Sequence, residues 1–370
     1  MQQTKSSRNP ALDVVRIFAL FCVIAEHFFL NSGYYAVYIV GAQLYVATIL
    51  RMFFMICVPL FLMLSGYLMK NKKPTKSYYK KLIRILAEYL LASLFCMAYS
   101  AVTEAGSLRE IVKAFMLQSL GILSFESARY SWYVKMYIGL FLLIPYLNVL
   151  YNGLQDRKQK QYLLLTMMLL TAIPDTLSCL RFSLPWAMTY NDPAGSFTMF
   201  PDWWNFCYPI TYYFLGAYLR EYPLELSGAK SVALILAGTL VTGTITYHLN
   251  AGMEFLYGTW QNNGSMFVGV QAVLVFNLLA RQDLRQLRPG VQKLLAGLSE
   301  LCFCAYLVSS VFDEYFYRLF TGEGSLLIHR LQYFFVLVPI VLVCSLATAY
   351  VLVSVCKIAT GLTQKVRSGL

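Results

Sequence analysis

Long runs of apolar residues recur along the whole chain and constrain what this sequence can fold into. A helix needs about 20 mostly apolar residues to cross the hydrocarbon core of a bilayer. Reading the 370 residues in this way gives ten candidate spans: 11–30, 46–69, 79–101, 130–151, 161–182, 203–220, 230–249, 264–281, 298–320 and 331–356. The sequence therefore predicts an all-α polytopic membrane protein, with a single membrane-embedded domain over residues 1–370.

Composition supports this prediction and excludes other classes of protein. Hydrophobic residues make up 58% of the chain and charged residues 13%, against roughly 45–50% and roughly 25% in soluble domains. So few charges cannot cover a soluble globule of this size, and disordered chains lack large apolar residues on this scale. The Cys residues form no CxxC pair, so we interpret them as small buried hydrophobes and expect no metal site.

The net charge of +12 predicts an orientation rather than a nucleic-acid partner. Lys and Arg are enriched about threefold in the loops on the same side as the N-terminus, a bias typical of cytoplasmic loops. With ten spans, both termini then lie in the cytoplasm of a multi-pass protein surrounded by membrane lipids. Lys5 and Arg8 precede the first apolar run and no small-residue cleavage site follows it, which predicts an uncleaved span rather than a signal peptide.

The first apolar run carries ionisable residues, and such residues usually face a protein interior or a wet cavity. Arg16 and His27 are eleven residues apart, so they share a helix face about 16 Å apart along the axis. Asp13 can pair with Arg16, while Glu26 points about 100° away from His27. An imidazole suits general base catalysis, although a structural histidine is the alternative. Arg51, in the second span, is a candidate for lining an outward cavity.

A second cationic group extends from Lys70 to Arg84. Anchoring of a cytoplasmic loop explains its first members. It explains Lys81 and Arg84 less well, because they begin the third span on one helix face and an Arg beside a Lys suits phosphates. Glu88 lies one turn after Arg84 and can pair with it. Ser65, followed by a glycine, lets two backbones approach closely. A cytosolic, phosphate-rich ligand could therefore reach this end of the spans.

Several of these residues belong to motifs that occur in a fixed order. Leu12-Asp13, Arg16 and His27 read LD-x-x-R-x10-H. Further motifs follow: Arg51 with Val58-Pro59-Leu60-Phe61 and Ser65-Gly66-Tyr67, Lys81-Leu82-Ile83-Arg84, Trp132-Tyr133 with Tyr137-Ile138-Gly139-Leu140 and Pro145, and Tyr208-Pro209 with Tyr212-Tyr213-Phe214-Leu215-Gly216. As a set covering the whole chain, they resemble the acyltransferase-three family of membrane proteins. The chain departs from the family at Lys81, which replaces the first Arg of R-x-x-R, and at Ser309, which replaces a late histidine whose role would fall to Ser309 or Ser310.

The resemblance implies an enzyme that moves an acyl group, most often acetyl, from cytosolic acyl-CoA to a hydroxyl of an extracytoplasmic envelope glycan or lipid-linked glycan. It implies acetyl-CoA or another acyl-CoA as donor substrate, no permanently bound cofactor, and a bacterial cytoplasmic membrane. His27 is then the expected general base, and Arg16, Lys81 and Arg84 the acyl-CoA-binding residues.

Other residues singled out above are candidates for lining a cavity or an acceptor site. The cavity or acceptor candidates are Asp13, Glu26, Arg51, Ser65, Trp132 and Tyr133. The two aromatic residues suit packing on sugar rings, although aromatic belts at the membrane interface also account for them. A membrane transporter or exporter of a small polar substrate, with this fold but without acyl transfer, is the alternative function.

Overall fold

The chain is described from a computed structural model that covers residues 8–104, 107–177, 200–255, 258–320 and 326–368. Its main elements are α-helices: α1 Pro10–Asn31, α2 Gly41–Phe54, α3 Cys57–Met69, α4 Lys76–Glu104, α5 Leu108–Ser124, α6 Trp132–Gly153, α7 Arg157–Leu170, α8 Ala172–Leu177, α9 Tyr208–Glu221, α10 Gly228–Asn250, α11 Met266–Ala280, α12 Pro289–Phe320 and α13 Phe334–Ser368. Within the described residues there is no β-strand, only two isolated bridges. The prediction of an all-α fold is therefore confirmed.

Six segments are long and apolar enough to cross a membrane, and together they make this a multi-pass membrane protein. They are Gly41–Met69, Lys76–Thr103, Trp132–Gly153, Gly228–Asn250, Pro289–Phe320 and Leu327–Ile358. The other four predicted spans overlap α1, α7 with α8, α9, and the shorter apolar helix α11, and residues 178–182 of the predicted span 161–182 lie outside the described residues. A total of ten spans and cytoplasmic termini stay predictions, as does the single domain over residues 1–370.

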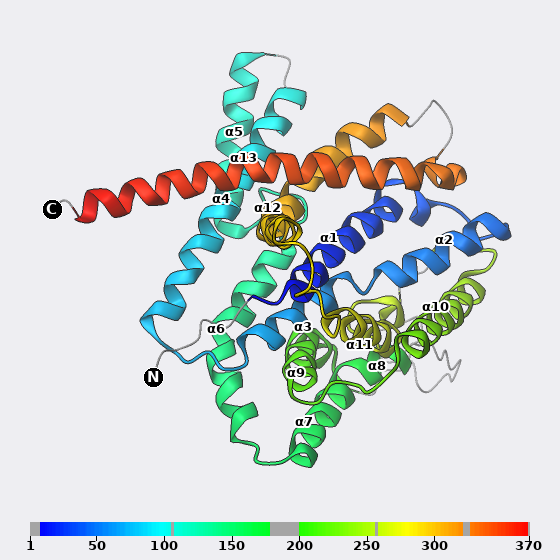
Figure 1. The fold of residues 1–370 in the computed structure, drawn as a ribbon. Coiled ribbons are helices and arrows are strands. Elements are labelled where there is room, and N and C mark those ends of the chain that lie inside the picture. The colour runs from blue at the N-terminus through cyan, green and yellow to red at the C-terminus, as the bar shows by residue number, and fades with distance from the viewer. Residues whose placement is uncertain (1–7, 105–106, 178–199, 256–257, 321–325, 369–370) are drawn as a thin grey trace.

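Helices differ in how deeply they lie within the bundle (Figure 1). Helices α2 and α3 together form the candidate span Gly41–Met69, and 72% of its most apolar 18-residue window is buried inside the protein. For α10 the corresponding share is 22%. Helix α1 contacts α2, α3, α11, α12 and α13, so it is surrounded by protein rather than by lipid. This explains how α1 can carry Asp13, Arg16, Glu26 and His27 in one apolar helix, because charged groups are tolerated in a bundle interior.

The second predicted span, 46–69, is broken rather than continuous. Helix α2 ends at Phe54, residues 55 and 56 form a turn, and α3 begins at Cys57. Pro59 lies in the first turn of α3, and a proline cannot continue a helix because it lacks the backbone N–H and clashes with the preceding turn. An interrupted helix within the depth of a membrane is tolerated where it lines a cavity. Met55, Cys57 and Val58 do line one.

Helices α3 and α9 approach each other backbone to backbone. A side-chain carbon built on Gly66 would collide with the carbonyl of Tyr213, and one built on Gly216 would collide with the carbonyl of Met63. Only glycine fits at these two facing positions, as at small-residue contacts between membrane helices. The Ser-Gly pair at residues 65 and 66 therefore permits the close approach expected from the sequence.

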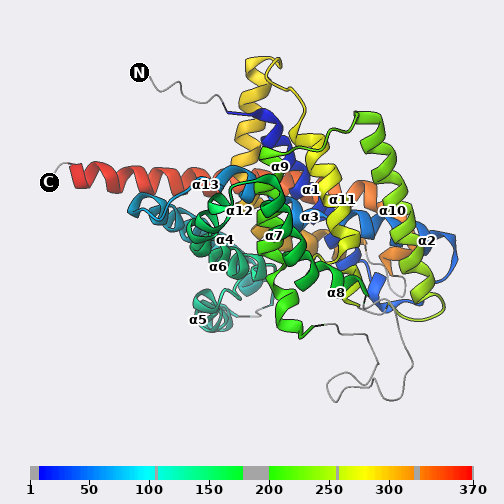
Figure 2. The ribbon, with the colours of Figure 1, turned by 90° about the horizontal axis from the view of Figure 1, so that it is seen from below.

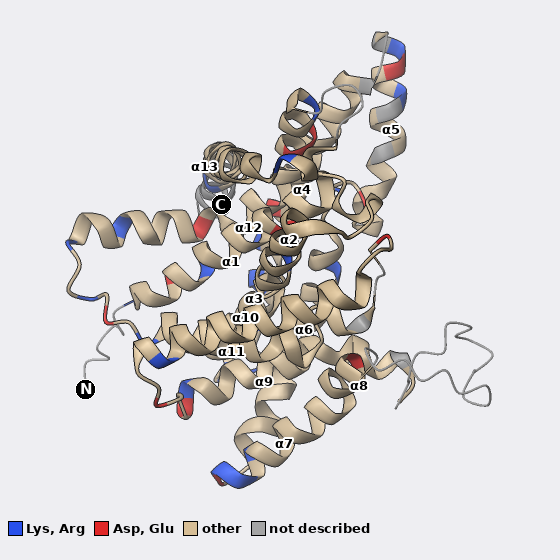
Figure 3. Cartoon of the chain, turned by 90° about the vertical axis from the view of Figure 1, so that its right-hand side faces the viewer, with Lys and Arg blue, Asp and Glu red and all other residues tan. Residues whose placement is uncertain are grey.

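Charged residues concentrate at helix ends and connections, whereas most of the helical surface is uncharged (Figure 3). This distribution suits a protein whose middle lies in hydrocarbon. Helix α5 stands apart from the main bundle, and α13 extends well beyond it (Figures 1 and 2). Much of the apolar surface of α5 is exposed, including Leu120 and Leu123. Neither helix contributes to the cavity described next.

Candidate active site

A cavity of about 770 Å³ runs along one face of α1, from Arg16 to Leu30. Its walls come from α1, the α2–α3 break, α4, α6 and α12. Pro10 at the first turn and the Asn9 side chain, which accepts a hydrogen bond of 3.1 Å from the Ala11 N–H, fix the start of α1. Arg16 and His27 open into this one cavity from opposite ends. The helical spacing of the sequence predicted that they share a face.

His27 lies buried at one end of the cavity, against a carboxylate and a phenol ring. Its Nδ1 lies 3.5 Å from Oδ2 of Asp313, and its ring centroid lies 3.7 Å from that of Tyr130. The Tyr130 hydroxyl donates to Asp313 Oδ2 at 2.8 Å and accepts from the Asn31 amide at 3.0 Å. Asp313 is fully buried, and within the described residues its Oδ1 makes no hydrogen bond. His27 Nδ1 makes no hydrogen bond among the described residues, so the carboxylate lies beside this nitrogen at ion-pair distance only. A carboxylate on this side of the imidazole leaves Nε2 for a substrate.

Sequence reasoning missed Asp313 and Tyr130. The signal for Asp313 was present, since an aspartate inside the predicted span 298–320 is an ionisable residue at membrane depth. Only packing of α12 against α1 reveals that it faces His27. The sequence comparison had singled out Ser309, one turn earlier on α12. Ser309 is fully buried and donates to the Tyr306 carbonyl at 2.8 Å, and it does not line the cavity.

Beside His27, a chain of three polar groups continues the cavity wall. The Tyr35 hydroxyl donates to Oε1 of Glu26 at 3.3 Å and accepts from Nε of Arg51 at 3.2 Å. Arg51 is 2% exposed and its guanidinium lies 5.0 Å from the ring centroid of Phe255. No carboxylate within the described residues forms an ion pair with Arg51. Glu26 and Arg51 therefore present an acceptor and a donor of hydrogen bonds to the same space.

The opposite end of the cavity, the arginine end, carries two arginines and, among the described residues, two carboxylates. Arg16 donates from Nη1 to the Ser299 hydroxyl at 2.8 Å. Arg84 pairs with Glu88 through an Nε–Oε1 contact of 2.8 Å, as its i,i+4 position predicted. Glu300 also lines this end. These side chains extend from α1, α4 and α12, so an anionic ligand here would contact three helices.

At this end one predicted ion pair is wrong, and one predicted binding residue lies outside the cavity lining. Asp13 does not pair with Arg16: its carboxylate accepts two hydrogen bonds from Arg8, of 2.9 and 2.7 Å, and it does not line the cavity. The i,i+3 spacing allowed a pair between Asp13 and Arg16. Instead, Arg8, which precedes α1, donates to both carboxylate oxygens of Asp13. Lys81 is exposed and lies outside the cavity lining, although its i,i+3 position puts it near the face of α4 that carries Arg84.

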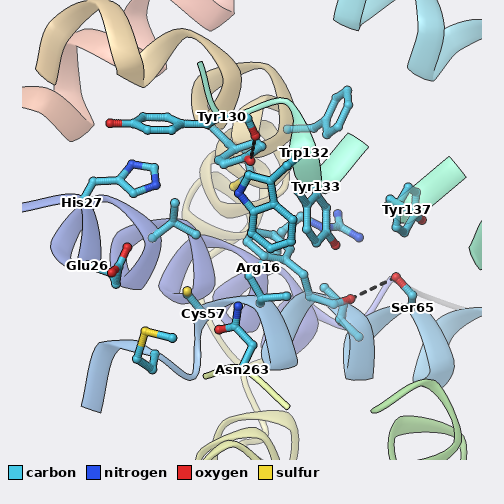
Figure 4. Close-up of a pocket in the computed structure, with 18 of the residues that line it drawn as sticks. Arg16, Glu26, His27, Cys57, Ser65, Tyr130, Trp132, Tyr133, Tyr137 and Asn263 are labelled. Carbon is cyan, nitrogen blue, oxygen red and sulfur yellow. Dashed lines mark hydrogen bonds between the residues drawn. The ribbon is translucent and has the colours of Figure 1, made fainter. Parts of the chain in front are cut away.

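The middle of the cavity is lined mainly by aromatic and apolar side chains. Trp132, Tyr133 and Tyr137 of α6 form one wall, with Ser65 of α3 facing them (Figure 4). Trp132 is 46% exposed, whereas Tyr133 is buried. The Ser65 hydroxyl donates to its own helix, to the Phe61 carbonyl at 3.0 Å. An uncharged passage thus joins the arginine end to the histidine end.

Together, the fold and this cavity define a class of protein. It is a multi-pass helical membrane protein with an interior site. In this site, a histidine beside a buried carboxylate lies about 16 Å along α1 from an end that carries two arginines. The model of the acyltransferase-three family, described as an acyltransferase domain, matches residues 9–352. The chain belongs to this family and is a membrane acyltransferase. No curated protein and no solved structure matches it.

Proposed function

We propose that this protein transfers an acyl group, acetyl in the first instance, from cytosolic acyl-CoA to a hydroxyl of an extracytoplasmic polysaccharide or glycolipid of the cell envelope. One observation carries the proposal. Arg16 and His27 line a single cavity from opposite ends, and a buried carboxylate stands behind the histidine. A transferase that joins a donor from one side to an acceptor from the other needs such a passage.

The donor, acyl-CoA, enters at the arginine end of the cavity. Arg16 and Arg84 bind the phosphates of acyl-CoA, because guanidinium groups suit phosphate oxygens. Lys81, exposed on the outer surface of α4, adds long-range attraction rather than a direct contact within the cavity. The pantetheine arm then follows the aromatic passage toward His27, over the spacing of about 16 Å set by eleven residues of helix. The cavity volume of about 770 Å³ lies within the range of ligand sites, roughly 300–1,000 Å³.

The reaction is a direct transfer with His27 as general base. His27 Nε2 takes the proton of the acceptor hydroxyl while the oxygen attacks the thioester carbonyl. The new C–O bond forms, the C–S bond breaks, and the leaving thiolate takes the proton from the imidazolium. Asp313 stabilises that imidazolium and holds the ring, with its own orientation set by the Tyr130 hydroxyl.

The acceptor binds near His27. Glu26 and Arg51 offer a hydrogen-bond acceptor and a donor, and Trp132 and Tyr133 offer aromatic faces. This combination suits a polyhydroxylated ring, because sugars present both hydroxyls and apolar faces. The predicted orientation, with the start of α1 in the cytoplasm, puts this end toward the outside.

The activity itself is tested with purified protein in lipid nanodiscs, given radiolabelled acetyl-CoA and a panel of glycan and lipid-linked glycan acceptors. We expect release of free CoA thiol and label in an acceptor. Silence across several acyl-CoA donors and the whole acceptor panel would contradict the proposal. It would favour the transporter alternative, which uptake into proteoliposomes would then test.

The role of His27 is tested by His27→Gln, with His248→Gln as control because His248 is exposed on α10. General base catalysis contributes about 10²–10⁴-fold, so kcat should fall by that order in the first variant and stay unchanged in the control. Size-exclusion profiles should match the parent protein. Full acetylation by a folded His27→Gln protein would exclude His27 as the base.

A further inference from the structure

A second, smaller cavity of about 310 Å³ lies at the same end of the bundle as Arg16. It shares no lining residue with the first cavity. Its walls come from Asn9 at the start of α1 and from the C-terminal ends of α3, α9 and α11, continuing into residues 281–285. Lys and Arg are visible at these helix ends in Figure 3. The charge bias of the loops predicts that this end is cytoplasmic.

The charges that line this second cavity are unbalanced. Three arginines, Arg220, Arg281 and Arg285, face a single carboxylate, Asp283. Among the residues that the structure describes, Asp283 forms an ion pair only with Arg285, at 3.5 Å between exposed side chains. Within the described residues, Arg220 and Arg281 have no ion-pair partner. In the first cavity, by comparison, Arg84 is paired with Glu88.

Backbone carbonyls hold both unpaired arginines in place. Arg220 donates from Nη1 to the Tyr67 carbonyl at 2.8 Å, and its guanidinium lies 5.8 Å from the Tyr67 ring centroid. Arg281 donates from Nη1 to the carbonyls of Leu224 and Leu226. Each guanidinium is thus fixed through one nitrogen. A planar guanidinium fixed in this way can still offer its other N–H groups to the oxygens of a phosphate.

The base of this second cavity is rigid and partly apolar. Asn277 is buried and uses both ends of its amide on Leu224, accepting from its N–H at 2.9 Å and donating to its carbonyl at 3.1 Å. The rings of Tyr67 and Phe276 lie 5.7 Å apart between their centroids. A ligand that carries a phosphate and a flat or apolar group would contact both surfaces. General enrichment of cations on the cytoplasmic side explains neither the cavity nor the anchoring.

We propose that this second cavity binds a phosphate ester, with Arg220 and Arg281 as its main contacts. Two molecules could supply that chemistry. One is the nucleotide end of acyl-CoA, and this source rests on the function proposed above. The other is the phosphate headgroup of an anionic lipid, and this source is independent of acyl transfer.

The test measures binding, so it does not depend on catalysis. In nanodiscs of neutral phosphatidylcholine, we would titrate adenosine 3′,5′-bisphosphate, with inorganic phosphate as a reference. In a second arm without nucleotide, native mass spectrometry would count phosphatidylglycerol retained from mixed nanodiscs. The test protein carries Arg220→Gln with Arg281→Gln. The control carries Arg288→Gln with Lys293→Gln, which removes two exposed cations of the same end that do not line the cavity.

The double variant Arg220→Gln with Arg281→Gln should bind at least tenfold more weakly than the parent protein in the nucleotide arm or in the lipid arm. The control variant should stay within about twofold of the parent protein in both arms. A loss confined to the lipid arm identifies a lipid site and leaves acyl transfer unaffected. Equal binding by all three proteins in both arms would overturn the proposal. If the double variant does not fold, Asp283→Asn decides: removal of the carboxylate should tighten binding about two- to threefold, and unchanged binding would count against the site.

Discussion

The two ends of the main cavity lie on the same helix but differ in burial and in charge balance. At the histidine end, His27 and Asp313 are 6% and 0% exposed. The Asn31 amide donates to the Tyr130 hydroxyl, and this hydroxyl donates to the carboxylate of Asp313, which lies 3.5 Å from His27 Nδ1. At the arginine end, the side chain of Arg84 is 58% exposed and is paired with Glu88. Solvent and carboxylates share this end with any ligand.

This difference predicts which kinetic parameter each end of the cavity controls. A buried group acts without competition from water, so its charge and orientation act strongly on a reacting bond. An exposed ion pair is screened and typically contributes little, about 0–1 kcal/mol. We therefore expect substitutions at the histidine end to change kcat, and substitutions at the arginine end to change the KM of the donor.

The largest effect in this comparison is expected for Asp313→Asn. The variant keeps the shape of the side chain but removes the charge that stabilises an imidazolium, so kcat should fall by about 10²-fold with little change in the donor KM. Thiol release from acetyl-CoA measures both quantities. Asp313→Glu should recover part of the rate, because it restores the charge at a slightly different position.

Glu314→Gln is the matched control for that variant. Glu314 is the next residue of α12, carries the same charge, and pairs with Arg318 rather than with His27. It should leave kcat unchanged. A folded Asp313→Asn protein with normal kcat would show that the carboxylate has no part in the reaction, and the two ends of the cavity would no longer differ.

The helical period of the sequence was sufficient to place Arg16 and His27 on one cavity, because α1 is a regular helix of 22 residues. Each of the ten predicted spans overlaps helical segments, although 46–69 is interrupted near Pro59 and 161–182 at Thr171. The partner of His27 could not be derived in this way. Asp313 is nearly 300 residues away along the chain, and its position depends on how α12 packs against α1.

Pairings at the arginine end were harder to predict, because several partners compete there. Asp13 was within reach of Arg16 by spacing, yet Arg8 binds it instead, and Arg16 turns to Ser299. Lys81 shares the basic segment with Arg84 but, unlike Arg84, does not line the cavity. Exposure and competition among neighbouring charges are properties of the folded bundle, so sequence spacing alone does not determine them.

An intermediate effect is expected for Arg16→Gln. A hydrogen bond to a charged group contributes roughly 1.5–3 kcal/mol, so loss of the guanidinium should raise the KM for acetyl-CoA by about tenfold or more. Effects on kcat should be smaller, because Arg16 lies about 16 Å from His27 along the helix. Ser299→Ala removes only the hydroxyl that Arg16 contacts and serves as the control. An unchanged donor KM in Arg16→Gln would show that Arg16 does not bind the donor.

The smallest effect is expected for Glu88→Gln, and its sign is the informative part. The carboxylate of Glu88 is 8% exposed and holds Arg84 at 2.8 Å. If donor phosphates compete with Glu88 for Arg84, the amide should lower the donor KM by about two- to threefold, within the range of a partly exposed ion pair. The effect should vanish when Arg84→Gln is already present, which a double-mutant cycle would reveal. A raised KM in the single variant would mean that Glu88 positions Arg84 for the donor instead of competing with it, and the carboxylates of the arginine end would then be part of the binding site.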